Sequence, residues 1–402
     1  MHGLATAHSH AFQRALRGRT QRRATAAGSF WSWRGLMYDL AEKLDPDDVF
    51  QLSRWAFLEL ALGGTTAVGE FHYVHHQPDG TPYPNRLELA EAVIAAAHEV
   101  GIRLCLIRTA YVRGGYNQPL ASAQIRFADT AVEDVLHDVD ELQRRYSADP
   151  LITIGVAAHS IRAVPLAQVA TLSGYAQESG LPFHMHLAEQ RQELAECRAE
   201  YGRPPVALLA DHGLLTPNLV AVHATHLEDE EVAALGAAGA MVCLCRTTER
   251  DLGDGLPRTA DLLSAGVRLC VGVDSHAVSD TFEELRAVEL DERSRTERRH
   301  AAAEAAELLR MGGEWGYAAL GMGEAWAEDK IILNPHDPAL VGLGEAWADE
   351  AAIFAASPAL CKRCGWLTSG LWPKENTSNK RWRGRDTAVP SKSWDYEKKD
   401  RG

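Results

Sequence analysis

The sequence contains very little lysine. Before residue 361 the basic side chains are almost all arginine, and the exceptions are Lys43 and Lys330. Residues 361–402 differ, because they hold six lysines and four tryptophans and carry a net positive charge. This change in composition predicts that 361–402 is an aberrant, disordered tail and not part of the folded domain.

Long apolar stretches are also absent. No run approaches the about 20 residues that a membrane-spanning helix requires. The N-terminus lacks the charged and then apolar pattern of a secretion signal. The formal net charge of −14 disfavours nucleic acid as a partner. We therefore expect a cytoplasmic enzyme with no membrane or nucleic-acid partner, and the sequence is compatible with a homodimer.

Short apolar stretches rich in β-branched residues recur along the chain. They predict eight strands, at residues 3–8, 65–71, 102–110, 152–158, 182–187, 218–223, 240–245 and 267–274. Segments with helical periodicity lie between them, as at 86–100, 130–146, 166–179 and 229–238. This alternation is typical of α/β proteins and predicts a (β/α)8 barrel of the TIM type, whose catalytic groups project from the C-terminal ends of the strands.

Histidines and one aspartate stand at the ends of these predicted strands. His8 and His10 are two positions apart, so both imidazoles point to the same side of a strand. His186 and Asp274 stand at the ends of the fifth and eighth strands. Because strand ends meet at the mouth of a barrel, we expect these side chains to bind one divalent metal ion. His184, two positions before His186, is an alternative ligand.

Two further residues near this site are candidates for proton transfer. Glu189 follows His186 by three positions, close enough to contact a water molecule at the metal. His223 ends the sixth strand and either binds the metal or hydrogen-bonds the nucleophile. The fourth strand contains no lysine, so it cannot supply the carboxylated lysine that bridges two metals in some barrel hydrolases. We therefore expect a site that holds one metal ion.

Six motifs carry a more specific signal: HSHAFQRALRG at 8–18, AAHSIRAV at 157–164, HMHLAEQ at 184–190, VHATHL at 222–227, TTERDLGDG at 247–255 and VDSH at 273–276. Together they resemble the amidohydrolase superfamily and, within it, the family of formiminoglutamate deiminases. The resemblance covers about residues 1–300. The first motif combined with the third is specific to the deiminases, whereas the histidine and aspartate pattern alone marks the superfamily.

The resemblance implies roles for individual residues. It implies that the metal, usually zinc, is held by His8, His10, His186 and Asp274. The residues implied in proton transfer are Glu189, His223 and Asp274. Those implied in substrate binding are Gln13, Arg34, Tyr73, His159 and Arg162. The implied reaction is the hydrolysis of N-formimino-L-glutamate to N-formyl-L-glutamate and ammonia in histidine degradation. Arginine suits such a small dicarboxylate substrate, because its planar cation binds carboxylates with two hydrogen bonds.

The chain departs from the family pattern at its ends and in one loop. Family members carry a longer segment before the first histidine pair, which forms a small β-sandwich with C-terminal strands. We therefore expect a barrel at 1–310, an incomplete β-sandwich remnant at 311–360 and the tail at 361–402. In the loop at 245–255, Arg246 and the pair Arg250 and Asp251 replace the proline and the Ala-Asn pair that are usual in the family.

Two rival interpretations remain. The first is another mononuclear zinc aminohydrolase that acts on a heterocyclic ring, which would have aromatic stacking groups in place of Arg34 and Arg162. The second is a truncated, inactive copy that binds metal weakly or not at all.

Overall fold

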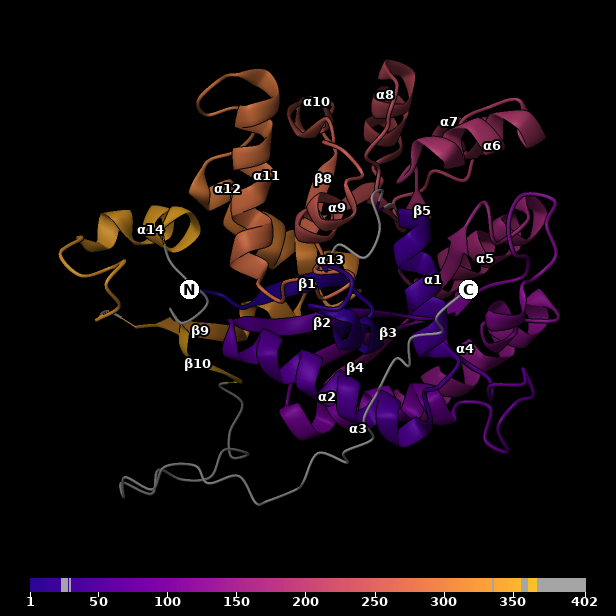
Figure 1. The fold of residues 1–402 in the computed structure, drawn as a ribbon. Coiled ribbons are helices and arrows are strands. Elements are labelled where there is room, and N and C mark those ends of the chain that lie inside the picture. The colour runs from indigo at the N-terminus through magenta and orange to yellow at the C-terminus, as the bar shows by residue number, and fades with distance from the viewer. Residues whose placement is uncertain (23–27, 29, 335, 356–360, 367–402) are drawn as a thin grey trace, which may run out of the picture. The chain divides into compact units, whose positions relative to one another are not determined.

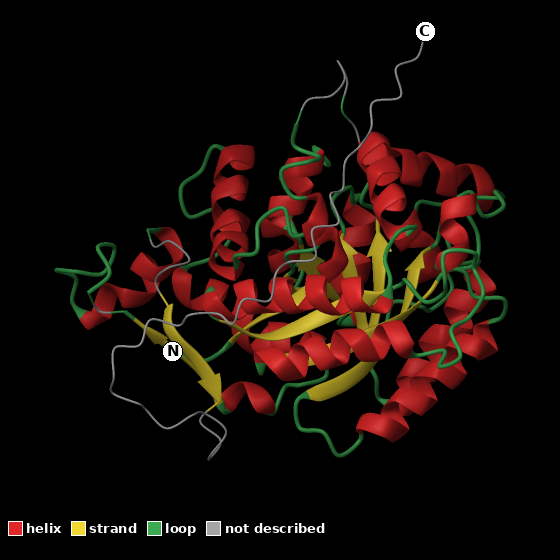
Figure 2. Ribbon diagram, turned by 60° about the horizontal axis from the view of Figure 1, so that its bottom comes forward, coloured by secondary structure: helices red, strands yellow, loops and turns green. Residues whose placement is uncertain are grey.

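Eight parallel strands in sequence order form a sheet that curves into a barrel, and helices surround it (Figures 1 and 2). The computed structural model describes residues 1–22, 28, 30–334, 336–355 and, for the backbone, 361–366. The barrel strands are β1 (Leu4–Ser9), β2 (Thr65–His72), β3 (Arg103–Ala110), β4 (Ile152–Ser160), β5 (Phe183–Leu187), β6 (Leu219–His223), β7 (Met241–Leu244) and β8 (Arg268–Val271). The predicted (β/α)8 barrel is confirmed.

Burial explains why the strands could be recognised from apolar runs. Every residue of β2 and of β3 is buried, because barrel strands have packed side chains inside and helices outside. Each of the eight strands begins within one residue of its predicted start. The positions of the strands therefore follow from the sequence pattern.

Helices lie between the barrel strands and after the last of them. They are α1 (Phe30–Ala41), α2 (Pro46–Leu62), α3 (Glu88–Val100), α4 (Val132–Tyr146), α5 (Leu166–Ser179), α6 (Arg191–Tyr201), α7 (Pro205–Asp211), α8 (Asp229–Ala238), α9 (Arg246–Leu252), α10 (Thr259–Ser264), α11 (Thr281–Thr296), α12 (Ala305–Arg310), α13 (Gly316–Ala319) and α14 (Ala348–Phe354). Gly101 after α3 and Gly180 after α5 adopt φ of 75° and 66°, a left-handed conformation that ends a helix. Among the described helices, none is long and apolar enough to cross a membrane.

The barrel closes between β1 and β8. Ser9 and Asp274 form a parallel bridge at this junction. The amide of His10 donates to the carbonyl of Asp274 over 2.9 Å, and the amide of Asp274 donates to the carbonyl of His8 over 3.0 Å. Glycine is required at 272, because a Cβ there would lie 2.7 Å from the Cβ of His8. The contacts that close the barrel therefore bring three predicted metal ligands together.

The chain after α12 covers the end of the barrel at which the strands begin. The hydroxyl of Tyr317 in α13 lies 2.6 Å from Oγ1 of Thr66, near the start of β2. The carbonyl of Ala319 accepts a hydrogen bond from Nε2 of His184 over 2.8 Å, near the start of β5. The opposite end, where the strands finish, is left open for a functional site.

A small second sheet lies outside the barrel. Strand β9 (Asp329–Leu333) pairs antiparallel with β10 (Cys361–Trp366), and the amide of Ile331 donates to the carbonyl of Met1. Strand β10 consists of the first residues of the segment 361–402, and the remaining residues, 367–402, lie outside the described part of the chain. The division at 310, the β-sandwich remnant and the disordered tail remain predictions.

Candidate active site

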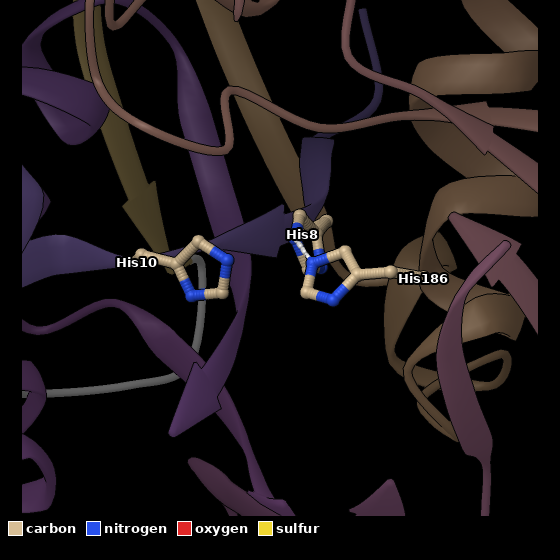
Figure 3. Close-up of side chains that lie close together, drawn as sticks. All are labelled: His8, His10 and His186. Carbon is tan, nitrogen blue, oxygen red and sulfur yellow. Dashed lines mark hydrogen bonds between the residues drawn. The ribbon is translucent and has the colours of Figure 1, made fainter. Parts of the chain in front are cut away.

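Three histidines and an aspartate converge at the C-terminal ends of the barrel strands. Figure 3 shows the imidazoles of His8, His10 and His186 directed toward one another. Nε2 of His8 lies 3.1 Å from Nε2 of His186. Oδ1 of Asp274 lies 3.5 Å from Nε2 of His8 and 3.3 Å from Nε2 of His10. The four predicted ligands therefore form one buried cluster.

The hydrogen bonds of these imidazoles direct their free nitrogens into the cluster. Nδ1 of His10 donates to the carbonyl of Phe71 over 3.0 Å, and Nδ1 of His186 donates to the carbonyl of His159 over 2.9 Å. A carbonyl only accepts, so each Nδ1 carries the proton and each Nε2 keeps its lone pair. Burial lowers the pKa of both rings, that of His10 to about 3.

This donor set fits a divalent metal ion. Nε2 of His8 and Nε2 of His186 lie 3.1 Å apart, close enough to bind one cation together. A tetrahedral site with metal–nitrogen distances of about 2.0–2.1 Å separates its ligand atoms by about 3.3 Å, which is near the separations in this cluster. Buried neutral imidazoles with one carboxylate are the ligands that zinc and similar ions use.

Backbone strain supports a functional role for the strand ends. His223 at the end of β6 has φ of 71°, and Asp274 after β8 has φ of 50°. Ala188 after β5 has φ of 53°. Residues other than glycine seldom adopt this left-handed backbone conformation, and those that do are concentrated at active sites. Here it turns the chain sharply, so that polar side chains face the mouth of the barrel.

His223 lies between three carboxylates. Its Nδ1 is 3.2 Å from Oε1 of Glu249, and its Nε2 is 3.8 Å from both Glu189 and Asp274. Burial alone would lower the pKa of His223, but the three negative charges outweigh it and raise the pKa to about 10. Burial also raises the pKa of Glu189. These two ionisable residues therefore lie close together beside the cluster.

Among the described residues, a second group of potential metal ligands consists of His223, Cys245 and Glu249. Its donor atoms are already used within the protein. Glu249 accepts hydrogen bonds from His223, from the amide of Cys245 over 2.9 Å and from the guanidinium of Arg246. The hydrogen bonds of the Glu249 carboxylate are thus complete without a metal ion. We assign this group to the support of His223 and not to a metal.

The five residues implied in substrate binding line one pocket together with His10, His186 and Asp274 of the cluster. The five residues are Gln13, Arg34, Tyr73, His159 and Arg162. Nε2 of Gln13 donates to the Tyr73 hydroxyl over 2.9 Å. Arg162 follows β4 and Arg34 belongs to α1, so two distant segments each contribute a guanidinium to the pocket.

Both guanidinium groups are available to an anion. Arg162 is 8% exposed, and its Nε has no hydrogen-bond partner. Within the described ranges neither Arg162 nor Arg34 forms an ion pair with a carboxylate. Arg162 is buried, and the charges of Glu193 and Glu189 stabilise its guanidinium without a direct ion pair. A pocket built in this way favours an anionic ligand.

Four other histidines have hydrogen-bond partners away from the cluster. Nε2 of His184 donates to a carbonyl at the opposite end of the barrel, which excludes it as a ligand of the cluster. His75 and His76 each bond a backbone carbonyl, at 2.9 and 2.8 Å. His98 pairs with Asp149 at 2.7 Å on the exterior. Of the two candidates on β5, the structure therefore retains His186.

Sequence reasoning missed most of the aromatic lining of the pocket. The additional lining residues are Phe30, Trp33, Met37, Tyr38, Tyr111, Phe127 and Leu252. Tyr38 was detectable, because it lies four residues after Arg34 on the same helix face. Glu249 was also missed as a functional residue, although it stands in the motif at 247–255. Its contact with His223 depends on the packing of α9 against β6 and has no local sequence signal.

Comparison with known proteins defines the family. The sequence profile described as "Amidohydrolase family" matches residues 1–325. The formimidoylglutamate deiminase of Pseudomonas aeruginosa is 36% identical over 386 residues, which are 92% of this chain and 83% of that protein. The 5-methylthioadenosine/S-adenosylhomocysteine deaminase of Teredinibacter turnerae is 29% identical over 58% of this chain and 48% of that protein.

Solved structures agree with this result. The crystal structure of an amidohydrolase from Brucella melitensis has a TM-score of 0.83 and 32% identity, covering 90% of this chain and 82% of that one. An adenosine deaminase from Xanthomonas campestris, solved with bound zinc, has a TM-score of 0.77 and 24% identity over 91% and 78% of the two chains. The chain belongs to the amidohydrolase family. It is a hydrolase of this family, and the relatives that it matches include a deiminase and deaminases.

Proposed function

We propose that this protein hydrolyses N-formimino-L-glutamate to N-formyl-L-glutamate and ammonia, with one zinc ion as cofactor. The observation that carries the proposal is the pair of unpaired guanidiniums, Arg34 and Arg162, beside the ligand cluster. A substrate with two carboxylates satisfies both cations through charge-assisted hydrogen bonds. The similarity to the formimidoylglutamate deiminase of Pseudomonas aeruginosa supports the same choice of substrate.

The ligands for the metal would be His8, His10, His186 and Asp274. When bound, a divalent ion supplies Lewis-acid activation of water. The protein's own groups hold the substrate and move the protons. Arg34 and Arg162 orient the carboxylates, so that the formimino carbon points toward the cluster.

Glu189 is the group proposed to shuttle the proton. Burial raises its pKa, which brings proton uptake and release closer to neutral pH. Its carboxylate lies 3.8 Å from Nε2 of His223 and faces the pocket. Glu189 would take a proton from water and deliver it to the imino nitrogen as the water oxygen bonds to the formimino carbon. It would then move the proton of the new hydroxyl group to the same nitrogen, so that ammonia leaves as the C–N bond breaks and the C=O bond of the formyl group forms. Nε2 of His223 would donate a hydrogen bond to the oxygen of the attacking water and orient it toward the formimino carbon.

A ring deaminase is the second candidate, and the aromatic pocket lining favours it. Tyr73, Tyr111 and Phe127 line the inner pocket and offer faces on which a planar base could stack. The relatives also include deaminases named for nucleoside substrates. A neutral heterocycle, however, has no anionic group that Arg34 and Arg162 could bind.

Ammonia release from a panel of substrates tests the proposal. Purified protein with zinc would be assayed with N-formimino-L-glutamate, formamidine, 5-methylthioadenosine and adenosine. We expect the highest kcat/KM for N-formimino-L-glutamate. A higher kcat/KM for either nucleoside would support the ring deaminase and contradict the proposal. Absence of turnover of all four compounds, with zinc bound, would support the inactive copy.

A further inference from the structure

Trp31 contacts both arginines of the pocket. It stands in the first turn of α1, and its ring centroid lies 4.3 Å from Cζ of Arg34 and 5.9 Å from Cζ of Arg162. A guanidinium within about 6 Å of an indole ring is attracted by the negative charge of the ring face. One side chain therefore joins two cations that come from different segments of the chain.

The two guanidiniums need such a contact, because they carry the same charge. Burial lowers the pKa of Arg34, and the charge of Arg162 lowers it further. A carboxylate in place of the indole would neutralise the pair and compete with an anionic substrate. An aromatic face offsets part of the repulsion and leaves the hydrogen-bonding edges of both guanidiniums free.

Trp31 also stands at the boundary between two cavities. Arg34 and Arg162 line both the inner pocket, which contains the ligand cluster, and an outer cavity. Trp31 lines the outer cavity only, where Glu196 is another lining residue. The indole therefore lies on the outer side of the arginines. Its removal would allow the guanidiniums to move outward, toward a competing carboxylate.

We propose that Trp31 is a positioning residue that holds Arg34 and Arg162 toward the inner pocket and thereby sets the preference for a dicarboxylate substrate. The inference rests on the proposed function, since it concerns how the two arginines bind carboxylates. It goes beyond that function by assigning specificity to a residue that does not line the inner pocket.

The test compares Trp31→Leu, Trp31→Phe and wild type in ammonia release from N-formimino-L-glutamate and from formamidine. For Trp31→Leu we expect KM for N-formimino-L-glutamate to rise about five- to thirtyfold, which corresponds to about 1 to 2 kcal/mol. Turnover of formamidine, which has no carboxylate, should not change. Trp31→Phe keeps an aromatic face and should recover most of the loss. Melting temperatures would confirm that the variants are folded.

Trp55 provides a matched control. It is a partly exposed tryptophan of α2 that contacts Arg54 at 5.6 Å and does not line either cavity. Trp55→Leu removes a similar contact between an indole and a guanidinium. It should leave ammonia release from N-formimino-L-glutamate and from formamidine unchanged. An unchanged KM in Trp31→Leu, or an equal loss of activity toward formamidine, would overturn the inference.

Binding of N-formyl-L-glutamate, measured by calorimetry, separates this inference from the proposed function. If wild type does not hydrolyse N-formimino-L-glutamate, the proposed function fails. Weaker binding of N-formyl-L-glutamate to Trp31→Leu than to wild type and to Trp55→Leu would still support the role of Trp31. Equal binding to the three proteins, or undetectable binding to wild type, would overturn it.

Discussion

Glu249 accepts a hydrogen bond from Nδ1 of His223 over 3.2 Å, which fixes the orientation of the imidazole. Nε2 of His223 is thereby directed toward Glu189 and Asp274, at 3.8 Å from each. Burial alone would raise the pKa of Glu249, but the charge of Arg246 and the hydrogen bond from His223 lower it. The orientation of a proposed catalytic group thus depends on a buried ion pair behind it.

The first prediction concerns this ion pair. Arg246→Met should lower the free energy of unfolding by on the order of 3–5 kcal/mol, because it removes the guanidinium that pairs with the buried carboxylate of Glu249. Chemical denaturation would measure the effect. The double variant Arg246→Met with Glu249→Gln removes both charges and should be more stable than the single variant. Equal stability of Arg246→Met and wild type would show that the pair contributes nothing.

The second prediction concerns the metal. Asp274→Asn should abolish turnover and lower zinc content from about one ion per chain, because it removes the only carboxylate of the proposed ligand set. The barrel should stay folded, since its closure uses the backbone amide and carbonyl of Asp274. Elemental analysis and circular dichroism would check both points. Two zinc ions per wild-type chain would contradict the mononuclear site.

The third prediction separates proton transfer from binding. Glu189→Gln keeps the shape of the side chain but cannot accept a proton. It should lower kcat by about 10²–10⁴ for N-formimino-L-glutamate and for formamidine alike, with a smaller change in KM. Steady-state assays of ammonia release would show this. A change restricted to KM would make Glu189 a binding residue.

The fourth prediction concerns the pH dependence of stability. Burial raises the pKa of Glu284 from its usual 4.5 to about 8, although Thr247 donates hydrogen bonds to it. Between these values the unfolded chain has released the proton and the folded chain retains it. The stability that the neutral carboxyl contributes is therefore fully present below pH 4.5 and is lost as the pH rises toward 8.

Glu284→Gln should remove this dependence. Relative to wild type, the variant should gain stability between pH 5 and pH 8, which thermal melts at both values would reveal. Glu283, a half-buried neighbour on α11, provides the control, and Glu283→Gln should show no such trend. An identical shift in the two variants would contradict the assignment to Glu284.

Patterns that repeat along the chain allowed most of the fold to be predicted. The strand starts follow from apolar runs, because strands buried on both faces exclude polar residues. His8 and His10 could be assigned to one ion, since side chains two positions apart share a side of a strand. Choosing His186 over His184 required the structure, because the spacing is the same and only the carbonyl of Ala319 distinguishes them.

Other features depend on contacts between distant segments and carry no local signal. Arg246 appeared only as a departure from the family's proline, and its burial against Glu249 emerges from the packing of α9. Trp31 precedes Arg34 by three positions, but its second contact, with Arg162, joins α1 to the loop after β4. The backbone of β10 extends from Cys361 because it pairs with β9, although composition predicts a disordered tail from that residue.

The most direct test of the dicarboxylate assignment is the effect of Arg162→Met on two substrates. Loss of a charge-assisted contact in a desolvated pocket costs on the order of 2–4 kcal/mol, or about 30- to 1000-fold in kcat/KM. We expect this loss, mainly through KM, for N-formimino-L-glutamate, and little change for neutral formamidine. If Arg162→Met impairs formamidine hydrolysis as severely, the arginine has a structural role and the assignment of a dicarboxylate substrate is contradicted.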